Sequence, residues 1–216
     1  MWIILGTLAC ALVAGAIYTL YGMHRIGVAT SGEKIDRSQR PNTALLIIDM
    51  QKDFTHLTGE KAWDTEYLED RIALINTLAA DAKKAGQPVI TIRQIFAPGY
   101  TSLLVRLLGQ GRGATGSAGL DLDDRLTFVA DADFTKHIGD AFSSPALNAM
   151  LDSHRIGHVK LAGLDGNYCV KNTAEGAVNR GYDVDVIYPA VLSSSLKTWE
   201  KQKQRLAGLG VQLNSL

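Results

Sequence analysis

The sequence predicts an α/β domain, with a mainly parallel sheet between helices on both faces, preceded by one N-terminal transmembrane helix. From residue 43 onward, short apolar runs alternate with amphipathic stretches, the pattern of strand–helix units whose strands lie parallel. Residues 2–23 form a run of 22 without a formal charge. The 216 residues, 46% of them hydrophobic and 20% charged, suit one globular domain with an appendage.

The uncharged N-terminal run is long enough to cross a bilayer. As a helix it reaches roughly 33 Å, against about 30 Å for the hydrocarbon core. Trp2 lies near one end, and Tyr18 and Tyr21 near the other, where aromatic rings favour the membrane interface. A cleaved signal peptide normally begins with a positive segment, which is missing here, and a buried core helix would have a polar face. We therefore expect an uncleaved anchor at residues 1–24.

The residues after this run carry the first charges of the chain. Basic side chains follow it and favour the cytoplasmic side for everything C-terminal to the run: Arg25, Lys34, Arg37 and Arg40. We thus expect a single-pass membrane protein with its catalytic domain in the cytoplasm. Residues 25–42 contain Gly, Ser, Gln and Pro without apolar periodicity, which indicates a juxtamembrane linker before a domain at 43–216.

Elements of the domain follow in order. Residues 43–48 (TALLII) predict a strand buried on both faces. Apolar residues at helical spacing from Leu68 to Ala79 predict a helix that stops near 86–88, followed by a strand at 88–95. The glycine-rich stretch 109–119 predicts a loop, because its resemblance to a phosphate-binding loop lacks the lysine.

The second half of the domain continues the alternation. The pattern predicts helices at 144–151, 170–180 and 194–206, strands at 158–162 and 183–187, and a last short strand near Val211. In such sheets, functional residues gather at the carboxyl ends of the strands.

Composition excludes several classes of function. Lys plus Arg equals Asp plus Glu at 22 each, so no basic excess indicates a nucleic-acid partner. Cys10 and Cys169 cannot form a disulfide framework, and no paired CxxC indicates zinc. The histidines show no metal-ligand spacing.

Three residues at predicted strand ends could carry chemistry. Asp49 directly follows the first strand, Lys136 ends another predicted strand, and Cys169 opens a helix. A thiol at a helix N-terminus favours the thiolate, a carboxylate could accept its proton, and a lysine could hold the charges in place. The alternatives are a buried structural cysteine and an ordinary surface lysine.

Three segments resemble the signature blocks of the isochorismatase-like cysteine hydrolases: LLIIDMQKDF (45–54), TKHIGDAFSSPAL (135–147) and AGLDGNYCVKNTAEGAVNRGYDVDV (162–186). That superfamily includes nicotinamidases, N-carbamoylsarcosine amidases, ureidoacrylate amidohydrolases and isochorismatases. The resemblance implies a three-layer α/β/α sandwich with a catalytic triad of Asp49, Lys136 and Cys169. It also implies a non-proline cis peptide at Leu164–Asp165 and an oxyanion hole formed by the backbone N–H groups of Tyr168 and Cys169 or their neighbours.

The resemblance further implies a hydrolase that cleaves a C–N bond of a small amide or ureido compound through a cysteine thioester. The alternatives are hydrolysis of a vinyl ether, as in isochorismatases, and a catalytically quiet, membrane-tethered interaction module. Phe54, Phe142 and Tyr168 are candidate substrate contacts, although each could equally pack in the core. Family members are commonly oligomers, so a homo-oligomer is also expected.

The nicotinamidase branch carries a metal-binding D-x-H block near the end of the second strand. Here the region reads TIRQIFAPGYTSL (91–103), with neither Asp nor His. We therefore expect no metal and no cofactor, with the small-molecule substrate and the membrane, through residues 2–23, as the partners of the chain.

Overall fold

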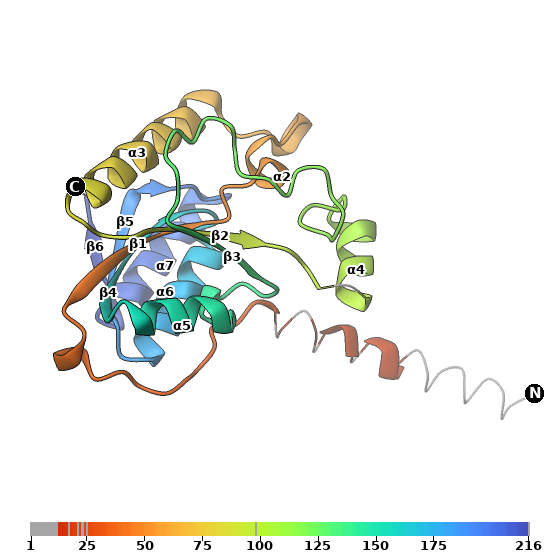
Figure 1. Ribbon diagram of the computed structural model, residues 1–216. Coiled ribbons are helices and arrows are strands. Elements are labelled where there is room, and N and C mark those ends of the chain that lie inside the picture. Colours follow the sequence, from red (N-terminus) through yellow and green to blue (C-terminus); the bar gives the residue numbers. More distant parts are fainter. Residues whose placement is uncertain are drawn as a thin grey trace, which may run out of the picture.

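A six-stranded parallel sheet forms the centre of the computed structural model, which describes residues 13–16, 18–20, 22, 24, 26–97 and 99–215 (Figure 1). The strand order is β3-β2-β1-β4-β5-β6, and all neighbouring pairs run parallel. The strands are β1 (Asn42–Ile48), β2 (Val89–Gln94), β3 (Ala132–Lys136), β4 (Ile156–Gly163), β5 (Asp183–Val191) and β6 (Gln212–Asn214). The predicted strands are thus confirmed, with β5 longer than expected.

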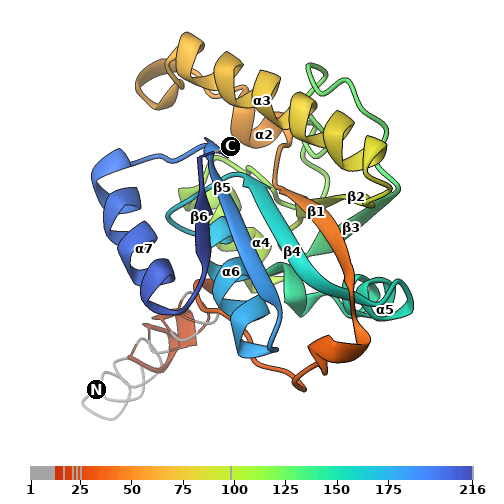
Figure 2. The ribbon, with the colours of Figure 1, turned by 90° about the vertical axis from the view of Figure 1, so that its left-hand side faces the viewer.

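Helices cover both faces of this sheet, as Figures 1 and 2 show. One face carries α3 (Thr65–Lys84), and the other carries α5 (Pro145–Ser153), α6 (Cys169–Asn179) and α7 (Leu196–Gly208). Shorter elements are α2 (Lys52–Thr55), α4 (Tyr100–Leu108) and the 3-10 turns η1 (Arg37–Gln39), η2 (Gly59–Lys61) and η3 (Ala141–Ser143). The three-layer α/β/α arrangement is confirmed.

Strand β1 explains why the layers hold together. Ala44, Leu46 and Ile48 lie in the core cluster that includes α5, α6 and α7, whereas Leu45 and Ile47 lie in the cluster that includes α3. All five are fully buried. A strand that is apolar at every position fits between two helical layers, because successive side chains point to opposite faces.

The segment expected to be a linker lies along the domain instead. We call residues 26–36 the strap. Its Ile26 carbonyl accepts a hydrogen bond from Gly139 N–H at 2.8 Å, and Thr30 donates to the Asp140 carboxylate through its N–H (2.7 Å) and its hydroxyl (2.6 Å). The buried Arg180 guanidinium donates to the carbonyl oxygens of Thr30 and Ser31, at 3.1 and 3.0 Å. These hydrogen bonds, together with Ile35 packed against the core, hold the strap on the domain.

The predicted transmembrane helix lies largely outside the described residues, since 1–12, 17, 21 and 23 are not among them. The described positions 13–16 and 18–20 are helical, and Val13, Tyr18 and Leu20 are exposed there. No helix made of described residues has the length and apolarity that a membrane span requires. The anchor therefore stays a prediction.

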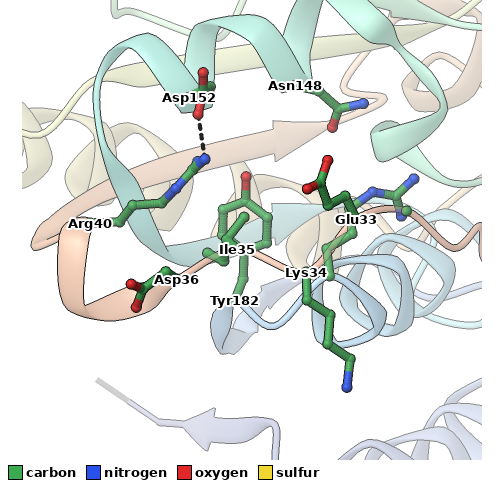
Figure 3. A pocket seen from close by; sticks show the side chains of 10 residues that line it. Glu33, Lys34, Ile35, Asp36, Arg40, Asn148, Asp152 and Tyr182 are labelled. Carbon is green, nitrogen blue, oxygen red and sulfur yellow. Dashed lines mark hydrogen bonds and ion pairs between the residues drawn. The ribbon is translucent and has the colours of Figure 1, made fainter.

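A cavity of about 650 Å³ lies beside the strap, at the edge of the sheet where the strands begin (Figure 3). Arg40, Asp152 and Tyr182 line it, and Arg40 pairs with Asp152 across it. Arg40 precedes β1 and Tyr182 precedes β5, so this cavity is at the opposite edge from the carboxyl ends of the strands. It is not the place where the predicted catalytic residues meet.

Candidate active site

Four neighbouring strands deliver polar residues to one point at the carboxyl edge of the sheet. Asp49 directly follows β1, Gln94 is the last residue of β2, and Lys136 is the last residue of β3. Cys169 is the first residue of α6, which follows β4 after a short turn. Because β3, β2, β1 and β4 are consecutive in the sheet, these residues, far apart in sequence, lie together.

The Lys136 ammonium is the centre of this cluster. Its Nζ donates to Asp49 Oδ2 at 2.9 Å, to Gln94 Oε1 at 2.5 Å and to Cys169 Sγ at 3.3 Å. Lys136 is only 1% exposed, so it is not a surface lysine. An ammonium has three N–H donors, and here each has a partner. The structure thus brings the three predicted catalytic residues into direct contact.

Close backbone approach places the end of β4 beside Asp49. Gly163 has φ +109°, and a side chain there would bring its Cβ within 2.2 Å of the Ile48 carbonyl oxygen. Leu164 N–H donates to that same oxygen at 2.9 Å. Asp49 itself has the left-handed φ of 52°, and its N–H donates to Ile92 O at 2.8 Å. Only glycine permits this contact between β1 and β4 at position 163.

The predicted cis peptide Leu164–Asp165 is present. In the turn that follows, Tyr168 N–H donates to Asp165 O at 3.0 Å, so this predicted oxyanion donor already has an acceptor. Cys169 N–H belongs to the first turn of α6, whose N–H groups have no acceptor within the helix. The geometry therefore favours Cys169, rather than Tyr168, as the backbone donor for an oxyanion.

Charge and burial set the protonation of the cluster. Burial raises the pKa of Asp49, although the Lys136 charge opposes it. Burial acts to lower the pKa of Lys136, but the negative charges of Asp49 and Cys169 outweigh it and raise that pKa. Burial also raises the pKa of the Cys169 thiol to about 12, with Lys136 opposing and Asp49 adding to the rise. Burial thus favours the neutral thiol of Cys169, against the thiolate that the helix N-terminus alone would favour, while Lys136 stays in contact with both Asp49 and Cys169.

A model of the isochorismatase domain family matches residues 43–215. The chain belongs to the isochorismatase family. It is 28% identical, over 160 residues, to the uncharacterized isochorismatase family protein YaaI of Bacillus subtilis (strain 168), a match that covers 72% of this chain and 83% of that protein.

Solved structures share the fold of this isochorismatase domain. N-carbamoylsarcosine amidase from Thermoplasma acidophilum superposes with a TM-score of 0.67 at 24% identity, covering 80% of this chain and 95% of that one. Pyrazinamidase/nicotinamidase from Streptococcus mutans UA159 gives 0.69 at 24% identity, covering 80% and 100%.

The three candidate substrate contacts have different surroundings. Phe142 is buried in the core beside Tyr182, with ring centroids 5.1 Å apart, which favours the alternative of core packing for this residue. Phe54 is half-buried against Gly113 of the glycine-rich loop. Tyr168 is exposed and directly precedes Cys169. Only Tyr168 adjoins the nucleophile and is open to solvent.

The described residues do not fit a metal ion. At the end of β2, the side-chain oxygen Oε1 of Gln94 already accepts a hydrogen bond from Lys136 Nζ. The nearby Asp53 carboxylate accepts from Gly113 N–H at 2.7 Å and from the Ser117 hydroxyl at 2.8 Å. The part of the chain that the structure describes holds no group of three His, Cys, Asp or Glu side chains able to share a metal.

Sequence reasoning missed two glutamines of the site. Gln51 Oε1 accepts from Gln94 N–H at 2.7 Å, and Gln51 Nε2 donates to Gln94 O at 3.2 Å, so one amide side chain fixes the end of β2. The Gln94 side chain is buried, and its Nε2 has no partner among the described residues. Because the bond from Lys136 fixes the orientation of this amide, the Nε2 group of Gln94 is an available hydrogen-bond donor beside Asp49, Lys136 and Cys169.

Proposed function

We propose that this protein is a metal-independent cysteine hydrolase that cleaves a C–N bond of a small amide or ureido compound through a thioester on Cys169. The observation that carries the proposal is the buried Lys136 ammonium in contact with both Asp49 and Cys169. The positive charge of Lys136 favours the ionised form of the Asp49 carboxyl, against the effect of its burial. A nucleophile with an adjacent base is the arrangement that covalent acyl transfer requires.

The first half-reaction forms the acyl-enzyme. Cys169 Sγ attacks the substrate carbonyl carbon while its proton moves to the Asp49 carboxylate, whose raised pKa makes it a stronger base than an exposed one. Cys169 N–H stabilises the negative oxygen of the tetrahedral intermediate. The Asp49 carboxyl then returns the proton to the leaving nitrogen, the C–N bond breaks, and a thioester remains.

The second half-reaction regenerates the thiol. Asp49 takes a proton from a water molecule, the resulting hydroxide attacks the thioester, and the carboxyl of Asp49 protonates the departing sulfur. Lys136 stays an ammonium throughout and holds Asp49 in place. The unpaired Gln94 Nε2 supplies one further donor, which suits a substrate with a second polar acceptor, as ureido compounds have.

We also propose that residues 2–23 anchor the protein in the membrane, with the catalytic domain on the cytoplasmic side. The supporting observations are the uncharged run and the basic residues that follow it. The strap then connects this anchor directly to the domain.

A screen of small amides and ureido acids, with ammonia detection, tests the function. The expected result is turnover by the native protein and none by Cys169→Ala, together with an acyl adduct on Cys169 detected by mass spectrometry after rapid quenching. Full turnover by Cys169→Ala would refute the nucleophile. If the native protein hydrolysed a vinyl ether, and Cys169→Ala hydrolysed it equally well, the thioester route would be wrong and the isochorismatase-type reaction right.

A further inference from the structure

Helix α4 exposes leucines and buries a polar residue, the reverse of an ordinary surface helix. Its polar Ser102 is only 6% exposed, whereas Leu103, Leu107 and Leu108 are 52%, 70% and 75% exposed. Leu103 and Leu107 are four residues apart and share one face of the helix. A surface helix normally buries its apolar side, so an apolar side that points outward indicates that something else covers it.

This helix lies at the edge of the domain where the N-terminal segment leaves. It follows β2, whose last residue, Gln94, is part of the catalytic cluster. The N-terminal segment meets the domain at Ile26, which accepts from Gly139 in the loop after β3. Figure 1 shows α4 and the described pieces of the N-terminal helix projecting from the same side of the domain, beyond the tip of β2.

The chain between the predicted membrane span and the first contact of the strap with the domain is very short. The uncharged run ends at Met23, and the first bond to the domain is at Ile26, three residues later. Three residues reach about 10 Å when fully extended. Because Thr30 and Ser31 are also bonded to the domain, the strap cannot peel away without breaking hydrogen bonds to the buried Asp140 and Arg180.

We infer that the exposed leucine face of α4 is a membrane-docking surface that lies in the lipid interface beside the anchor. A nine-residue helix is about 13 Å long, and an interfacial helix of this kind buries its apolar side about 5–10 Å deep. Exposed Arg106, between the leucines in sequence, donates through Nη2 to Thr115 O at 2.7 Å, and the other N–H groups of its guanidinium can face the lipid phosphates. Docking holds the carboxyl edge of the sheet, with the catalytic cluster, toward the membrane.

A second copy of the chain is the competing occupant. The face of one nine-residue helix is much smaller than the roughly 800 Å² that each partner buries in a stable complex. The short tether, in contrast, brings α4 to the membrane without any partner. The inference rests on the proposed anchor and is independent of the proposed chemistry.

The test uses the full chain in phosphatidylcholine vesicles, with an environment-sensitive fluorophore on a single introduced cysteine. Leu107→Cys and Leu103→Cys report on α4, each in a background in which Cys10 and Cys169 are serine. Val129→Cys is the matched control, because Val129 is an exposed apolar side chain before β3, at the opposite edge of the sheet. We expect the emission of fluorophores on α4 to shift to the blue when vesicles are added, and to be quenched when the vesicles contain doxyl-labelled lipid. The emission of the control fluorophore should show neither change.

Three results would overturn the inference. If the protein floats with the vesicles but both α4 labels behave like the control, the anchor holds and the docking surface is wrong. If the protein does not float with vesicles, the anchor itself fails, and amide turnover by the native full chain, which keeps Cys169, would show that the chemistry survives. If the α4 labels are shielded only as protein concentration rises, and the same cysteines cross-link when they are left unlabelled, a second copy covers the helix.

Discussion

Replacing Lys136 by methionine should destabilise the protein as well as inactivate it. The substitution keeps the length of the side chain but leaves the Asp49 carboxylate, 3% exposed, without its counter-charge. Breaking a buried ion pair by removing one partner costs about 3–5 kcal/mol, because the remaining charge stays desolvated. Asp49→Asn together with Lys136→Met removes both charges, so the double variant should recover much of that loss.

The pH dependence of this loss has a definite sign. Burial raises the pKa of Asp49, so the native state binds more protons than the unfolded chain, and stability falls as pH rises through that raised pKa. The charge of Lys136 opposes this rise in the pKa of Asp49, so the pKa should rise further when Lys136 is replaced. The penalty in Lys136→Met should therefore be larger at about pH 8 than at about pH 5.

Urea unfolding of residues 25–216 measures the change, since this segment contains the strap and every strand. Lys84→Met is the control, because the Lys84–Asp81 pair is mostly exposed and should change stability by less than about 1 kcal/mol. The reasoning is refuted if Lys136→Met costs no more than Lys84→Met, or if its cost is the same at both pH values.

The remaining predictions address the thiol, the second donor, the strap and the metal. Iodoacetamide should alkylate Cys169 more slowly than free cysteine at neutral pH, and the rate should still rise beyond about pH 9; a plateau near pH 7 would contradict the raised pKa. Gln94→Met should lower kcat/KM by about 10–100-fold while the exposed control Gln204→Met leaves it unchanged, and equal values would exclude the donor role. Thr30→Val removes a hydrogen bond to a buried carboxylate and should lower the free energy of unfolding by about 1.5–3 kcal/mol, against almost nothing for Thr77→Val, whose hydroxyl bonds only within an exposed helix. Turnover should survive 1,10-phenanthroline; activity lost to the chelator and restored by metal would show that residues 91–103 were misinterpreted.

The parts of the fold that hydrophobic patterning controls could be predicted from the sequence. In β1 the five consecutive residues 44–48 are apolar, so this part of the strand has to be buried on both faces, and this sets the layers. The three candidate catalytic residues could be proposed from the sequence because they follow or end predicted strands and lie in the three segments that resemble the family's signature blocks. Gln94 could not, since a neutral amide has no such signature and its importance comes from contacts with Lys136 and Gln51.

Two other features depend on contacts between residues far apart in sequence. The sequence of the strap resembles a linker because its partners, Asp140 and Arg180, lie more than 100 residues away. Helix α4 was overlooked between a strand and a glycine-rich loop, although LLVRLL has helical spacing of its leucines. Phe142 lies within a catalytic block of the sequence, yet its side chain points into the core, which block membership cannot indicate.

The raised pKa of the partly exposed Cys169 thiol also predicts how the protein responds to oxidation. Peroxide attacks thiolates, and a cysteine with a pKa of about 12 is ionised only to roughly one part in 10⁵ at pH 7. Sulfenic acid formation at Cys169 should accordingly be slow while the site is empty. In the mechanism proposed above, the proton on sulfur leaves for Asp49 only when a carbonyl is in place to be attacked, so we expect Cys169 to react during turnover and to resist oxidation between turnovers.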